Sequence, residues 1–178
     1  MNEQRGRGMI IKDKINQMLD TLPEEELDNV YWFVYYLRNI YLHKWNLFGK
    51  GVKVTYLFEE SEKLMQLWEY NFTRKISNET KESIYYNQFK WHIYSYEKED
   101  CLKEEAAREA FDVVLKDEIY VMYQNSPFVM LYSNATELIS TDFDNEQDIY
   151  IFDKSCTWTY VNTHESMCGP YFATKVGP

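Results

Sequence analysis

The stretch of sequence that decides the fold runs from residue 119 to residue 132 and reads IYVMYQNSPFVMLY. Two runs within it, 119–123 and 128–132, are rich in the β-branched and aromatic residues that favour strands. The four residues between them, QNSP, are typical of a tight turn. This part of the sequence therefore predicts an antiparallel hairpin.

Further strand-like runs lie on both sides of this hairpin. Residues 149–152 and 157–161 form a second pair around a polar turn, and an extended segment covers 52–58. The apolar pair at 171–172 follows Gly169-Pro170. We therefore expect an antiparallel sheet of about five strands. Residues 84–96 stay ambiguous, since alternating apolar side chains fit a strand while the residues before them fit a helix equally well.

Helical periodicity marks the first half of the chain. Apolar residues recur at helical spacing over 10–20, and the segment 23–46 follows a capping sequence, TLPE. Helices early and antiparallel strands late indicate an α+β protein, in which an N-terminal helical hairpin and further helices pack on the sheet. The further helices are expected over 59–76, from an Asn78 cap onward, and over 101–112, the last burying Leu102, Ala106, Ala110 or Phe111.

The composition divides the chain into three parts. Residues 1–8 are polar and are expected to form a flexible arm. Residues 9–48 form the helical hairpin, and Gly49-Lys50-Gly51 separates it from an α+β domain over 50–178. The helix over 23–46 is apolar nearly all round, so it needs partners on several sides. We expect it to form a homodimer, or to pack against the rest of the chain.

Charge is distributed unevenly along the 178 residues. The chain has a net charge of −10, and residues 101–150 alone carry three basic and eleven acidic groups. Such a field repels phosphate backbones, so nucleic acid is not expected as a partner, whereas a basic protein would be attracted. The surface expected to bind it lies around 97–118 and 137–148. The alternative is that these acids only keep an aromatic-rich protein soluble.

The amino terminus and the cysteines bear on the compartment. The opening residues lack the apolar core of a secretory signal, and no apolar run approaches the ~20 residues of a membrane-spanning helix. Three cysteines, Cys101, Cys156 and Cys168, do not form a disulfide framework. We therefore expect a cytoplasmic protein with no membrane partner.

Several segments together resemble a known family. They include KWH at 90–92, DIYI at 148–151, TWTYVNTHE at 157–165 and CGPYF at 168–172. Over about residues 50–172 the chain resembles an uncharacterised family of Gram-positive bacteria, known only as a domain of unknown function. Similar strand endings occur in bacterial immunity-type proteins, and the LPEEEL-type start at 22–27 resembles helical hairpins of some antitoxins. Neither resemblance implies an activity or a catalytic residue.

Two histidines and their neighbours are the candidate site. His164 and Glu165 end a predicted strand, and His92 lies beside Trp91. If these segments are neighbours, the imidazoles could converge, with histidine as a general base oriented by the glutamate. The alternative is that both histidines donate structural hydrogen bonds at strand ends. Trp158 and Tyr160 complete the candidate binding set, unless they fill the core.

The sequence predicts no metal and no cofactor. His164 and Cys168 have the spacing of one zinc-ligand pair, but a structural zinc site usually uses two such pairs. Carboxylates at 142, 144, 146, 148 and 153 follow calcium-loop spacing, but Gln147 occupies the position that requires glycine. A cysteine nucleophile would need Cys156 or Cys168 to meet a histidine in space.

These observations favour a protein-interaction module, of immunity or antitoxin type, with an acidic surface. The alternative is a hydrolase-like enzyme that uses His92, His164 and Glu165. A third reading is a structural dimer whose functional surface is the helix over 23–46. No catalytic motif decides whether the chain is an enzyme.

Overall fold

The computed structural model describes residues 2–175, without the side chains of 2–9 and 36. The chain forms two units, one up to Leu42 and one from His43 onward. The helices are α1 (Asn2–Leu19), α2 (Glu24–Gly49), α3 (Ser61–Thr73), α4 (Asn78–Ser83), α5 (His92–Ser95), α6 (Glu104–Val113) and the 3-10 helix η1 (Ser140–Phe143). The strands are β1 (Lys53–Leu57), β2 (Leu102–Lys103), β3 (Glu118–Tyr123), β4 (Val129–Ser133), β5 (Ile149–Asp153), β6 (Trp158–Asn162) and β7 (Tyr171–Thr174).

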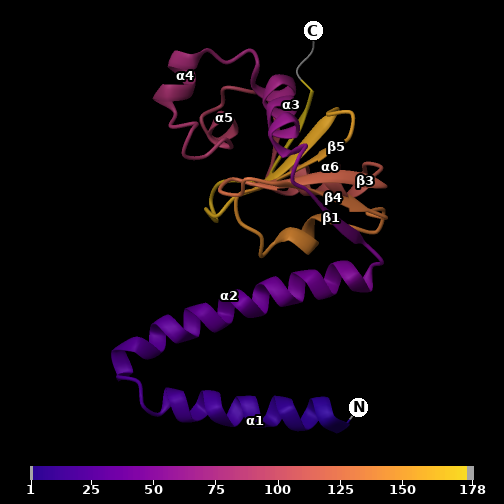
Figure 1. Cartoon of the computed structure of the whole chain (residues 1–178). Coiled ribbons are helices and arrows are strands. Elements are labelled where there is room, and N and C mark those ends of the chain that lie inside the picture. Colours follow the sequence, from indigo (N-terminus) through magenta and orange to yellow (C-terminus); the bar gives the residue numbers. More distant parts are fainter. Residues whose placement is uncertain (1, 176–178) are drawn as a thin grey trace. The chain divides into compact units, whose positions relative to one another are not determined.

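The second unit is built on one seven-stranded sheet (Figure 1). The strand order is β1-β4-β3-β5-β6-β7-β2, and every neighbouring pair is antiparallel. Short connections join β3 to β4, β5 to β6 and β6 to β7, whereas residues 134–148, which include η1, lead from β4 to β5. Both edge strands come from earlier in the sequence. The predicted α+β class is confirmed, and so are the paired strands on which it was based.

Both faces of the sheet are buried. Successive strand residues point to opposite faces, so alternate residues enter two separate cores. Ile149 and Ile151 of β5 enter the first core, while Tyr150 and Phe152 enter the second. A strand between two cores is apolar at every position, which explains the runs that the sequence shows here.

Different helices cover the two cores. The first core contains Ala107 and Phe111 of α6, Phe143 of η1 and Leu47 from the last turn of α2. The second contains Trp68 of α3 together with buried residues of the segment 84–94. The indole N–H of Trp68 donates to the Thr159 hydroxyl of β6 over 2.9 Å, so this helix is also joined to the sheet by a buried hydrogen bond.

The sheet has seven strands, where about five were expected. The additional pairing joins β2 to β7, and β2 lies inside the segment 101–112 that was predicted as helix. The helix there begins only at Glu104. Leu102 is consequently exposed, as is Ala106, whereas Ala107 and Phe111 are buried. The expected burial was therefore wrong for Leu102 and Ala106 and right for Phe111.

The segment 84–96 contains a short helix and turns but no strand. Its alternating residues Trp91 and Ile93 are buried, but Trp91 directly precedes α5 and Ile93 lies within it, so neither belongs to a strand. The cap of α4 is Ser77, whose hydroxyl accepts the Thr80 N–H, and not Asn78, the first residue of that helix. Both corrections concern local side-chain contacts that periodicity does not report.

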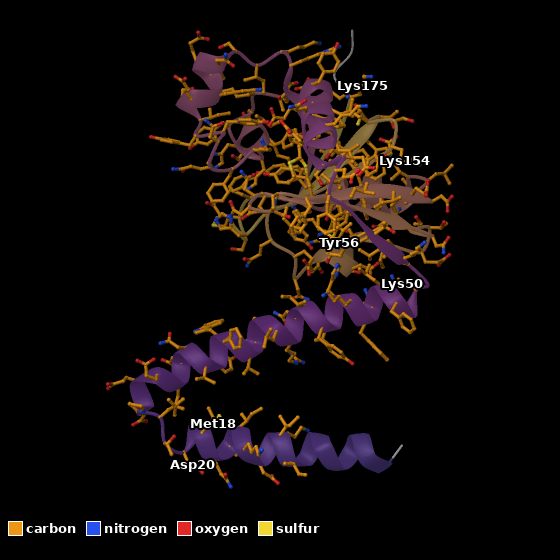
Figure 2. The ribbon with its side chains drawn as sticks, in the orientation of Figure 1. Met18, Asp20, Lys50, Tyr56, Lys154 and Lys175 are labelled. Atoms are coloured by element: carbon orange, nitrogen blue, oxygen red, sulfur yellow. The ribbon has the colours of Figure 1, made fainter. Side chains whose placement is uncertain are left out.

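The first unit is helical and exposes many large apolar side chains. The structure continues α1 back to Asn2, so residues 2–8 are helical where a flexible arm was expected. Figure 2 shows side chains of α1 and α2, including Met18, which is 65% exposed. On α2, the exposed set includes Leu27, Tyr31, Trp32, Phe33, Val34, Leu37 and Tyr41. No described helix is long and apolar enough to cross a membrane.

Within the second unit, a buried carboxylate of η1 holds the last turn of α2. Asp142 of η1 accepts hydrogen bonds from Lys50 at 2.6 Å and from Asn46 at 2.7 Å, and its side chain is 7% exposed. The backbone N–H of Ile139 donates to the same carboxylate. Burial alone would raise the pKa of Asp142, but these bonds from Lys50, Ile139 and Asn46 hold its pKa below the ordinary value.

Replacing Asp142 by asparagine is expected to lower the free energy of unfolding by about 1–3 kcal/mol at neutral pH, because Lys50, Asn46 and the Ile139 N–H lose a charged acceptor. The contribution of this carboxylate is full above its unfolded pKa near 3.8 and is lost as the pH falls through the lower folded value. The difference between Asp142→Asn and wild type should therefore shrink in acid. Chemical denaturation over a pH series measures it.

The control is Asp144→Asn. Asp144 is 44% exposed and pairs with Arg108 at the surface, so its loss is expected to cost under about 1 kcal/mol. Equal effects of the two substitutions, or an effect of Asp142→Asn that is unchanged in acid, would contradict this account.

Candidate functional site

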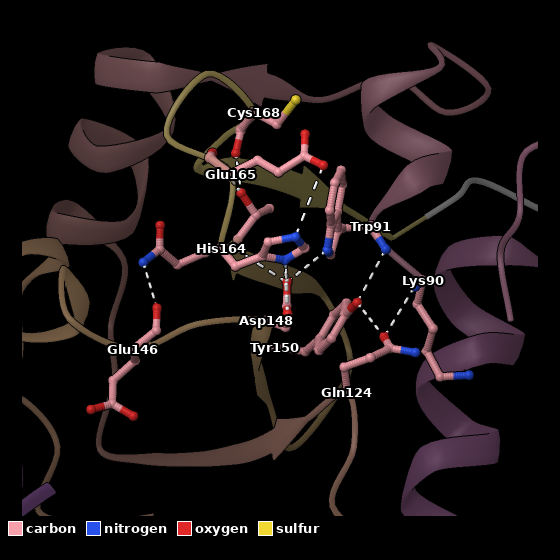
Figure 3. Close-up of polar contacts among 11 residues, drawn as sticks. Lys90, Trp91, Gln124, Glu146, Asp148, Tyr150, His164, Glu165 and Cys168 are labelled. Atoms are coloured by element: carbon pink, nitrogen blue, oxygen red, sulfur yellow. Dashed lines mark hydrogen bonds and ion pairs between the residues drawn. The ribbon is translucent and has the colours of Figure 1, made fainter. Parts of the chain in front are cut away.

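A single carboxylate organises the candidate site. Asp148 Oδ1 accepts the indole N–H of Trp91 over 2.8 Å, and it lies 2.9 Å from Nδ1 of His164. The backbone N–H of His164 also donates to this carboxylate, over 3.3 Å. Figure 3 shows the three side chains converging. Asp148 thus joins the 84–96 segment to the loop after β6.

The strand register explains why these residues meet. Ile149 of β5 pairs with Asn162 of β6, so Asp148 and His164 leave the sheet side by side. Asp148 has φ of 51°, in the left-handed region that aspartate tolerates better than most residues. The left-handed backbone conformation therefore occurs at the same residue whose side chain contacts Trp91 and His164.

A second hydrogen-bond chain fixes the other side of the segment (Figure 3). The Tyr150 hydroxyl accepts the Trp91 backbone N–H over 3.1 Å and donates to Gln124 over 2.7 Å. Gln124 Oε1 also accepts the Lys90 N–H over 3.0 Å. Burial raises the pKa of Tyr150 well above its ordinary value, so this hydroxyl stays protonated and can donate. Lys90 and Trp91, which directly precede α5, are therefore held by the side chains of Gln124 and Tyr150.

Both candidate histidines lie against the same two aromatic rings. The His164 ring is centred 4.8 Å from Phe89 and 5.8 Å from Trp91, and the His92 ring is 5.4 Å and 4.5 Å from them. His92 Nδ1 lies 2.6 Å from the Ile84 carbonyl oxygen, so this ring nitrogen is used within its own segment. The structure thus brings His92 and His164 to one aromatic cluster, with different polar partners.

The remaining predicted residues divide between the surface and the core. Trp91 is buried at the base of the cluster, and Glu165 is half-exposed, its Oε1 3.9 Å from His164 Nε2. Trp158 and Tyr160 are buried in the first core, where both rings pack against Phe111. They therefore lie apart from the histidines, in agreement with the core alternative.

Asp148 is the member that sequence reasoning missed. Glu165 was expected to orient His164, but it is Asp148 whose carboxylate reaches Nδ1, while Glu165 faces the other ring nitrogen. Asp148 stands at the end of an acidic run, which was interpreted as a solvated turn. Asp148 comes directly before the predicted strand 149–152, and His164 follows the strand predicted to pair with it, 157–161. This placement was the available signal.

Cys168 is not set up as a nucleophile. Burial and a hydrogen bond to the Glu165 carboxylate both raise the pKa of this thiol, which lowers its thiolate fraction at neutral pH. Burial likewise raises the pKa of Cys156 to about 11 and that of Cys101 to about 11. These three thiols are free and weakly nucleophilic.

The carboxylates with calcium-loop spacing are each used elsewhere. Asp142 binds Lys50, Asp144 pairs with Arg108, and Glu146 accepts the Tyr123 hydroxyl. Asp148 contacts Nδ1 of His164, while Asp153 accepts backbone N–H groups of its own turn. Within residues 2–175, as far as side chains are described, no group of three or more potential ligands could hold a metal ion.

The fold and the site together define a class: an α+β protein with a seven-stranded antiparallel sheet covered on both faces and an aspartate–histidine pair at one end of it. The chain belongs to the family of the domain of unknown function DUF4275, whose family model matches residues 16–172. The match begins within α1, whereas the resemblance was expected from about residue 50. The bacterial source and the quoted motifs stay predictions. No curated protein and no solved structure matches the chain.

Replacing Asp148 by asparagine is expected to lower the free energy of unfolding by about 1–3 kcal/mol, because Trp91 and His164 lose a charged acceptor in a site where the Asp148 side chain is 15% exposed. Thermal or chemical denaturation measures the change. The matched control is Glu165→Gln, which alters a half-exposed group 3.9 Å from the imidazole and should change stability by under about 0.5 kcal/mol. An Asp148→Asn variant as stable as wild type would mean that the carboxylate does not hold the two segments together.

Proposed function

We propose that the protein is a binding module for a basic protein partner, and that α6 carries the contact surface. The observation that supports this most is the division of the acidic groups over 101–150. Six of the eleven accept hydrogen bonds or form ion pairs inside the second unit. Most of the acids left for a partner therefore lie on α6. The six engaged acids are Asp112, Glu118, Asp142, Asp144, Glu146 and Asp148.

Three of the remaining acids lie on α6. Glu104, Glu105 and Glu109 are exposed, and no side-chain hydrogen bond or ion pair to them occurs within the described part of the chain. The second expected surface, 137–148, is weakened by comparison, because most of its carboxylates already have partners. Unpaired carboxylates on a rigid helix attract and orient a basic partner.

Apolar side chains adjoin this acidic face. Val113 ends α6 with 81% of its surface exposed, and Leu115 follows with 91% exposed. The turn that presents them is fixed by Lys116, whose Nζ donates to the carbonyl oxygens of Phe111 and Val114. A combination of apolar anchors with charged neighbours is the usual composition of a protein interface. The partner that fits has basic side chains around an apolar contact.

An immunity- or antitoxin-like role in the cytoplasm is one concrete form of this proposal. In such a role the acidic surface would cover a basic protein and block it. The resemblance of the sequence to immunity-type strand endings and antitoxin-type hairpins supports it, together with the free acids of α6.

The test is charge reversal on α6. Affinity capture from an extract of the source cells, followed by binding measurements with the captured protein, should give an affinity that falls when Glu104, Glu105 and Glu109 are replaced by lysine. Raising salt from about 50 to about 500 mM should weaken wild-type binding, because the Debye length shortens. The control reverses Glu59, Glu60 and Glu62, which are also exposed, and should retain binding. Salt-independent capture, or equal losses in both variants, would contradict the proposal.

A second candidate is a hydrolase-like site at His164, favoured by the Asp148–His164 contact. A carboxylate at Nδ1 holds an imidazole so that Nε2 can accept a proton from an attacking water. The His164 side chain is 34% exposed, so Nε2 can be reached from solvent. A hollow of about 380 Å³ beside α4 is lined by residues outside this site, including Lys75 and Glu99.

Activity on p-nitrophenyl esters separates this candidate from the binding module. If His164 is the base, His164→Ala should abolish turnover and Asp148→Asn should reduce it at least about tenfold, since general-base catalysis contributes about 10²–10⁴-fold. Cys168→Ser should leave turnover intact. Turnover that survives His164→Ala would exclude this residue as the base.

A further inference from the structure

We propose that α2 pairs with the α2 of a second copy of this chain, antiparallel and across a two-fold axis near Val34. The observation behind it is the exposed apolar surface of the first unit. Tyr31, Val34 and Leu37 are 59%, 54% and 49% exposed. Most helical stability in proteins comes from tertiary packing of an apolar face, and contiguous exposed apolar patches mark interaction sites.

The apolar stripe has the symmetry that a two-fold pairing requires. Counting outward from Val34, Leu27 and Tyr41 stand seven residues away on either side, and Tyr31 and Leu37 stand three away. At 100° per residue, all five fall within one side of the helix. When two such helices run antiparallel, each residue of the stripe meets its counterpart from the other half, as an isologous interface demands.

The charges on α2 fit an antiparallel arrangement and oppose a parallel one. The first turn is acidic, with Glu24, Glu25 and Glu26, and Asp28 follows one turn later. Arg38 lies in the other half of the helix. An antiparallel pair sets Asp28 of each copy near Arg38 of the other, whereas a parallel pair sets acid against acid.

The net charges favour a second copy at this surface over other occupants. Residues 1–42, the first unit, carry five basic and seven acidic groups, so two first units repel each other only weakly. Residues 43–178, the second unit, carry fourteen basic and twenty-two acidic groups, so contact through the second unit would meet a larger repulsion. An anionic lipid surface is disfavoured as well, because it would face the acidic first turn rather than a basic helix.

Part of the apolar surface belongs to α1. Ile11, Ile15 and Met18 recur at helical spacing and are 47%, 47% and 65% exposed. Because α2 is apolar on more than one side, two hairpins together could cover it as a four-helix bundle, the usual arrangement of two antiparallel helical pairs. The pairing of α2 with α2 forms the centre of that bundle.

The test measures the mass of the full chain by sedimentation velocity across about 1–100 µM, a range that spans ordinary dimer affinities. Wild type should approach twice 21.6 kDa as the concentration rises. Arg38→Asp should raise the dissociation constant about tenfold, because two attractive pairs become repulsive, and Asp28→Arg should do the same. The double variant, Asp28→Arg with Arg38→Asp, should restore wild-type association.

Two further variants complete the design. Val34→Glu places two carboxylates at the two-fold axis and should leave only monomer over this range. Glu25→Arg makes the same charge change as Asp28→Arg on the side of the helix opposite Val34, and it should leave the dissociation constant within about twofold. A wild-type protein that is monomeric at every concentration overturns the proposal. Failure of the double variant to restore association overturns the antiparallel arrangement.

Discussion

Burial of both faces of one antiparallel sheet is the constraint on which the other elements of the second unit depend. An antiparallel sheet is often solvated on one side, but here alternate residues of the central strands enter two different cores. Each core then needs its own cover: α6, η1 and the end of α2 on one face, and α3 with the 84–94 segment on the other. The Asp142 and Asp148 carboxylates hold members of these two covers in place.

This arrangement explains what the sequence predicts well. Most residues of β3, β4, β5 and β6 are apolar, and many are β-branched or aromatic, because both faces of these strands enter a core. Such runs are recognisable without coordinates. The helix α6 was also recognisable from its alanine and glutamate content, although the first residues of the segment predicted as helix form β2. The long apolar α2 was expected, since its length and capping sequence are local properties.

The segment 84–96 and the residue Asp148 show why the rest was not predictable. Phe89, Trp91 and Ile93 alternate as in a strand, but the segment donates backbone hydrogen bonds to Gln124 and Tyr150. These acceptors hold it as turns around α5, and they lie far away in the sequence. Asp148 gains its role only when β5 pairs with β6 and the 84–96 segment covers that end of the sheet. Such contacts depend on the whole fold, and local periodicity does not contain them.

The order of the strands also determines when the protein can fold during its synthesis. The edge strands β1 and β2 emerge from the ribosome early, but their partners β4 and β7 follow only after Val129 and Tyr171 have been made. The aromatic residues of α3 and of the 84–94 segment have no sheet to cover until the last third of the chain is complete. The nascent chain therefore passes through a long interval with exposed apolar surface, in which unpaired strands and uncovered aromatic side chains favour aggregation.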